Sequence, residues 1–79
     1  MRLSDLPLRT AAQISAIDWA SLGEAEAKRL RELGFDEGVQ IEALHSGSMF
    51  GRDPIALRVG RMTVAIRRAQ AHAIRVALA

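Results

Sequence analysis

Two histidines, His45 and His72, are the side chains of this sequence best suited to hold a transition metal, since imidazole and carboxylate are common ligands. They stand far apart in the sequence, and neither has a second histidine one helical turn away. Glu42 or Asp53 could join them only if the fold brought the four together, which no spacing requires. We therefore interpret both histidines as surface residues and predict no metal ligand and no cofactor.

Nucleophilic and acid–base chemistry also lacks the side chains it needs. Ser46 and Ser48 lie close to His45, but no nucleophile elbow surrounds either serine, and the chain has no cysteine. No phosphate-binding loop of the Walker type is present in the sequence either. We therefore predict no catalytic residue and expect that the protein is not an enzyme.

A segment from Ser46 to Pro54 is the better candidate for function, because it joins two expected strands by more than a hairpin turn. Met49 and Phe50 stand between glycines there and are followed by Gly51 and Arg52. Their apolar side chains could form an adhesive surface, or Phe50 could fold back as a lid on a small core. We take these four residues as candidate partner-binding residues.

Charge is distributed unevenly along the chain. Residues 1–43 hold eight acidic and five basic side chains, whereas residues 44–79 hold six arginines and one aspartate. Blocks of one sign can attract a partner of the other sign, although exposed arginines are often only the solvated face of a strand. Arg58, Arg61 and Arg67 join the candidate partner-binding residues on this ground.

The elements that must position these side chains begin with one helix. Ser21 and Glu24 have the spacing of a capping box, which predicts a helix from about Leu22 to Leu33. Gly34 then supplies the left-handed residue that ends it. The residues expected to face the core are Leu22, Ala25, Leu30 and Leu33.

Alternating apolar and polar residues predict five strands. The first covers about Ala12 to Ile17, and Gly60 with Arg61 suits a two-residue turn between two of the others. The remaining strands are Val39–Leu44, Ile55–Val59, Met62–Ile66 and Ile74–Leu78, with one helical turn at Arg68–His72. We expect residues 1–79 to form one mainly β domain with one inserted helix, a small, partly open barrel of about five strands. A four-stranded sheet packed on one helix is the alternative.

Three groups of residues resemble the FeoA family, small cytosolic proteins that accompany a bacterial ferrous-iron transporter. They are Leu30, Leu33, Gly34 and Gly38; Gly51, Asp53, Pro54 and Ile55; and Met62–Ile66 with Arg67, Arg68, Ile74 and Val76. The resemblance implies an SH3-like barrel that docks on the cytoplasmic part of the transporter FeoB. The commonest family pattern runs Pro, Leu, Gly, Asp, Pro without a break, but here Met49 replaces the first proline and Arg52 is inserted before Asp53.

The remaining expectations concern compartment and an alternative role. No apolar run approaches the roughly 20 residues that span a bilayer, and cysteine is absent, so we expect a cytoplasmic protein. The alternative function is a nucleic-acid-binding or regulatory SH3-like accessory module related to metal-responsive repressor domains. The arginines of the second half favour that alternative, whereas the scarcity of aromatic stacking residues speaks against it.

Overall fold

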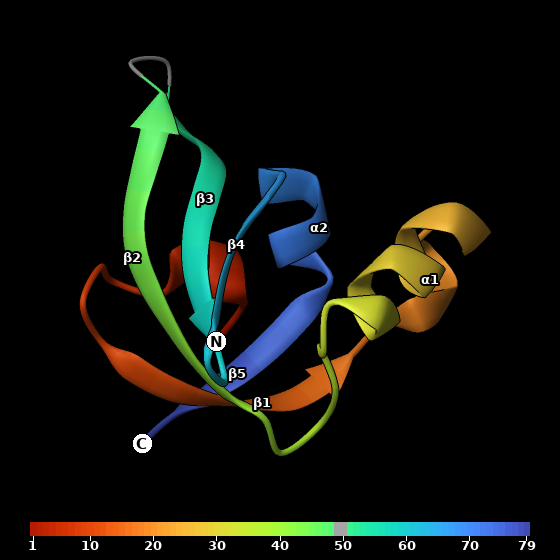
Figure 1. Cartoon of the computed structure of the whole chain (residues 1–79), viewed down its shortest axis with the longest axis horizontal. Coiled ribbons are helices and arrows are strands. Elements are labelled where there is room, and N and C mark those ends of the chain that lie inside the picture. The colour runs from red at the N-terminus through yellow and green to blue at the C-terminus, as the bar shows by residue number, and fades with distance from the viewer. Residues whose placement is uncertain (49–50) are drawn as a thin grey trace.

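The computed structural model describes residues 1–48 and 51–79, with backbone only at residues 46–48, 51 and 52. Its five strands form one antiparallel sheet in the order β4-β3-β2-β1-β5 (Figure 1). The elements are η1 (Leu3–Asp5), β1 (Ala11–Ile17), η2 (Trp19–Ser21), α1 (Glu24–Glu32), β2 (Gln40–Ser48), β3 (Gly51–Val59), β4 (Met62–Ile66), α2 (Arg68–His72) and β5 (Ile74–Leu78). Because α2 joins the two edge strands, the sheet forms a partly open barrel. The four-stranded alternative is therefore wrong.

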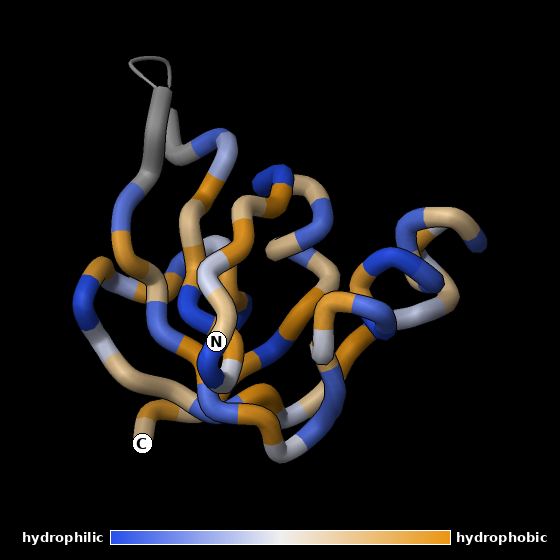
Figure 2. Tube along the Cα trace, viewed as in Figure 1, coloured by the Kyte–Doolittle hydropathy of each residue, from blue (hydrophilic) through white to orange (hydrophobic). Residues whose placement is uncertain are grey.

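The core is filled by every second residue of the strands, as Figure 2 shows in the alternating colours along β3. On β3, Ile55 and Leu57 are fully buried whereas Arg58 is exposed. Leu3 is the first residue of η1 and Leu6 follows it, and both pack into the same core. The N-terminal segment thereby covers part of a barrel that a chain of this length could not fill with strands alone.

Helix α1 begins two residues later than the sequence predicts. Ser21 donates its hydroxyl to the carbonyl of Asp18 at 2.9 Å and so belongs to the preceding turn. Gly23 is the N-cap instead, and its amide donates to the Glu26 carboxylate at 3.4 Å. Of the residues expected to face the core, Leu30 is buried and Leu22 and Leu33 are partly buried against it, whereas Ala25 is exposed and Ala27 is buried instead.

The end of α1 is confirmed as a glycine stop. Gly34 has a φ of +94°, and its amide donates to the carbonyl of Arg31 at 3.1 Å. The amide of Phe35 donates to the carbonyl of Leu30 at 3.0 Å, which completes a Schellman motif. Leu30 and Phe35 are both buried, so the apolar contact typical of this motif anchors the helix end to the core.

The predicted loop from Ser46 to Pro54 is largely wrong. β2 continues to Ser48, β3 starts at Gly51, and these two residues pair, so the strands form a long arm that reaches beyond the rest of the sheet (Figure 1). The register of this ladder shifts between Ala43 and His45 and again before Ser48. Such bulges interrupt the alternation of apolar and polar residues, so the sequence does not show where these strands end.

The hairpin between β3 and β4 is confirmed. Val59 pairs with Met62, and Gly60 has a φ of +58°, which places positive φ at the first central position as a type II′ turn requires.

Candidate partner-binding surface

The three candidate arginines do not form one patch. Arg58 lies on β3 and Arg61 lies in the β3–β4 turn, so these two share one end of the hairpin. Arg67 follows β4, and the six residue steps from Arg61 to Arg67 span roughly 20 Å at about 3.3 Å per residue. A partner would have to contact two separate areas to use all three.

Arg58 is already paired within the chain. It faces Glu42 across the β2–β3 ladder, and its guanidinium nitrogen lies 3.3 Å from the Glu42 carboxylate. This is the only salt bridge within the described part of the chain. The Arg58 side chain is 53% exposed, so solvent screens the pair, but its charge is largely balanced locally.

Arg67 borders a groove of about 390 Å³ between α1 and the start of α2. Arg29 lines the opposite side from α1, and Ile66 supplies apolar surface. Gln70, which is 9% exposed, accepts from the Arg67 amide at 3.0 Å and donates to the Glu26 carboxylate at 3.3 Å. Glu26 and Gln70 thus link the starts of the two helices. Each is the third residue of its helix, but the sequence alone does not show that they meet.

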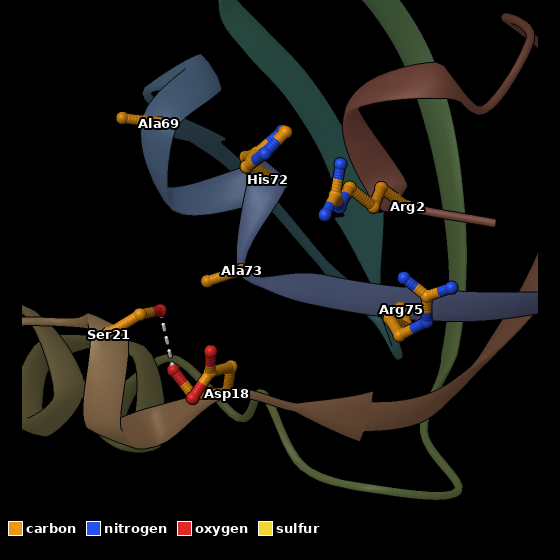
Figure 3. Close-up of a pocket in the computed structure, with 7 residues that line it drawn as sticks. All are labelled: Arg2, Asp18, Ser21, Ala69, His72, Ala73 and Arg75. Atoms are coloured by element: carbon orange, nitrogen blue, oxygen red, sulfur yellow. Dashed lines mark hydrogen bonds between the residues drawn. The ribbon is translucent and has the colours of Figure 1, made fainter.

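A second cavity, of about 330 Å³, is lined by residues that the sequence did not identify as a site. Its lining includes Arg2 from the N-terminal segment, Arg75 from β5 and His72 from α2, with Asp18 and Ser21 on the other side (Figure 3). Arg2 and Arg75 are partners in an isolated antiparallel bridge between the two ends of the chain. No local spacing marks such a pairing, so no signal in the sequence could have revealed it.

The histidines remain separate from any cluster of metal ligands. His45 and His72 are both exposed, and only His72 lines the cavity of Figure 3. Over residues 1–48 and 51–79, no three His, Asp or Glu side chains are grouped so that they could hold a metal ion. None of the helices described here is long and apolar enough to cross a membrane.

The candidate residues of the β2–β3 connection are only partly covered. Gly51 and Arg52 begin β3, whereas Met49 and Phe50 lie outside the described residues. Whether Phe50 is an adhesive side chain or a core lid therefore stays a prediction.

Comparison with known proteins identifies related sequences and structures. The FeoA domain model matches residues 1–78. The FeoA protein from Chlorobium tepidum is 28% identical with a TM-score of 0.84, and the match covers 99% of this chain and 70% of that one. Stenotrophomonas maltophilia FeoA complexed with zinc, described as a procaryotic SH3 domain protein, is 35% identical with a TM-score of 0.80, covering 98% and 89%.

The fold extends beyond this family. T. acidophilum IdeR has a TM-score of 0.80 at 23% identity, and the match covers all of this chain but 34% of that one, so it shows a shared fold alone. No curated protein matches the chain. The expected SH3-like barrel is confirmed, and the chain belongs to the FeoA family of ferrous-iron transport accessory domains.

Proposed function

We propose that this chain is a non-catalytic cytosolic module that docks on the cytoplasmic part of a FeoB-type ferrous-iron transporter and supports iron uptake. The observation that carries the proposal is the FeoA domain match over residues 1–78, because that family accompanies ferrous-iron transport. To change transport, the module must bind two conformations of its partner with different affinities, since equal affinities would shift nothing.

The proposed interface includes Gly51 and Arg52 at the start of β3 and Met49 and Phe50 just before them in the sequence. The arginines Arg58, Arg61 and Arg67 complete it. The arm supports this choice because its backbone projects from the barrel (Figure 1). Among the arginines, Arg58 contributes least because Glu42 already balances its charge. Arg61 and Arg67 form no ion pair within the described residues, so a partner's carboxylates can reach them.

A binding assay with the purified cytoplasmic part of a FeoB-type transporter tests the proposal. We expect the immobilised module to retain the transporter fragment, and a failure to bind would contradict docking. A labelled DNA duplex in the same assay tests the nucleic-acid alternative. We expect DNA retention that is weak, independent of sequence and lost as salt rises, because only phosphate attraction would drive it. Sequence-specific retention at physiological salt would favour the alternative.

A further inference from the structure

Arg2 and Arg75 place two positive charges directly opposite each other. Backbone contacts fix this arrangement, since the Val76 amide donates to the Met1 carbonyl at 2.7 Å and the N-terminal ammonium donates to the Val76 carbonyl at 3.0 Å. Like charges at paired positions destabilise a ladder. Neither guanidinium has a side-chain hydrogen bond or ion pair among residues 1–48 and 51–79. An anion between them would convert this repulsion into two attractions.

The cavity beside the two arginines has the dimensions and walls for a small acidic group. Its volume of about 330 Å³ is at the lower end of ligand sites. Ala69 and Ala73 line it with methyl groups only, which leaves room for the methylenes of an acidic side chain. His72 lines the same cavity and offers an imidazole N–H as a further donor (Figure 3).

The charge of the cavity favours an anion. Arg2 and Arg75 outnumber Asp18, the one carboxylate that lines the cavity, and the Met1 ammonium lies next to Arg2. An acidic side chain of a protein partner brings one carboxylate, whereas phosphate would also place a second negative charge near Asp18. Guanidinium groups also bind carboxylates through two parallel hydrogen bonds, which favours an oriented contact over loose attraction.

We propose that the cavity formed by Arg2, His72 and Arg75 binds an aspartate or glutamate carboxylate from an acidic segment of the docking partner. The inference rests on the proposed function, because it names the chemistry by which the transporter would be recognised. It adds a second contact area at the joined ends of the chain, separate from the β2–β3 arm (Figure 1).

The direct test is an NMR titration of the isotope-labelled full chain with the blocked tripeptide Ala-Glu-Ala and with Ala-Gln-Ala as its uncharged match. We expect the glutamate peptide to shift the amide signals of Arg2, His72, Ala73 and Arg75, and the glutamine peptide to leave them unchanged. Inorganic phosphate should shift the same signals less. Shifts located elsewhere, no shifts, equal shifts with glutamine, or stronger shifts with phosphate would each overturn the proposal.

Variants sharpen this test without disturbing the core, since Arg2 and Arg75 are both exposed. Arg75→Gln and Arg2→Gln should each weaken glutamate-peptide binding about tenfold, the effect of losing one charge-assisted contact. Arg9→Gln is the matched control, because Arg9 is exposed and does not line the cavity, and it should leave peptide binding unchanged. A loss in Arg9→Gln equal to that in Arg75→Gln would overturn the assignment to this cavity.

The two proposals fail in distinguishable ways. If the peptide does not bind but the wild-type chain retains the transporter fragment, the cavity proposal is wrong and docking stands. If the peptide binds at the cavity but the transporter fragment is not retained, the carboxylate site stands and the docking partner is wrong.

Discussion

Two cross-strand pairs in this barrel use arginine in opposite ways. Glu42 and Arg58 face each other on the β2–β3 ladder and form a 3.3 Å ion pair. Arg2 and Arg75 face each other where the two ends of the chain meet, and neither guanidinium forms an ion pair within the described residues. The three arginines of these pairs are all exposed, so exposure alone does not distinguish the pairs.

The difference shows that counting basic residues is a poor guide to a binding surface. Arg58 belongs to the arginine-rich half of the sequence, yet Glu42 of the same chain already balances its charge. Arg2 lies in the acidic half, yet the fold sets it beside Arg75 and a cavity. Uncompensated charge that the backbone holds in place is the better indicator, because a ligand then meets a site that is already arranged.

Truncating a side chain of the hydrophobic core, on which both pairs depend, should give the largest loss of stability. Phe35 is 1% exposed, and Phe35→Ala should lower the free energy of unfolding by about 3 to 5 kcal/mol. Chemical denaturation followed by circular dichroism measures this change. Leu8→Ala is the control, because Leu8 is 42% exposed and its truncation should cost less than about 0.5 kcal/mol. Similar losses in the two variants would show that the assigned core is wrong.

The sequence between β2 and β3 is a third candidate region to compare with the two pairs. Replacing Met49 and Phe50 with serine should weaken transporter binding by about 1 to 4 kcal/mol and leave the melting temperature nearly unchanged, if both act as exposed anchors. A melting temperature lowered by several degrees would identify Phe50 as a core lid instead. Met62→Ser is the matched control, because Met62 is 50% exposed and lies outside the proposed interface.

A substitution at Gly34 tests whether this residue ends α1. Gly34→Val should destabilise the protein by about 1 to 2 kcal/mol, since a β-branched residue is strained at a φ of +94°. No heavy atom lies within 4 Å of an added Cβ, so the loss would report backbone strain and not a clash. Gly34→Asn should cost less, because asparagine tolerates this region. Equal melting temperatures for wild type and Gly34→Val would refute the glycine stop.

These regions also show what could be predicted from sequence. The glycine stop at Gly34 and the five strands follow from local rules, because left-handed backbone and two-residue alternation are written in neighbouring residues. The start of α1 was misplaced because Ser21 satisfies its own turn. The bridge between Arg2 and Arg75 joins the two ends of the chain, so no local rule could find it or its cavity.

The smallest expected effect is a difference in stability between variants of the two pairs. Arg58→Gln should lower the free energy of unfolding by about 0.2 to 1 kcal/mol, because it removes an exposed attraction. Arg75→Gln should leave stability unchanged or raise it by a few tenths of a kcal/mol at most, because it removes a repulsion. Parallel thermal melts at low salt compare the two variants. A larger loss for Arg75→Gln would mean that its charge is compensated within the fold.

The most direct test of the comparison is calorimetric binding of the transporter's cytoplasmic fragment to wild type, Arg75→Gln and Arg58→Gln. We expect Arg75→Gln to bind about tenfold more weakly than wild type, whereas Arg58→Gln should stay within about threefold of wild type. Wild-type affinity in Arg75→Gln, or a greater loss in Arg58→Gln, would contradict it.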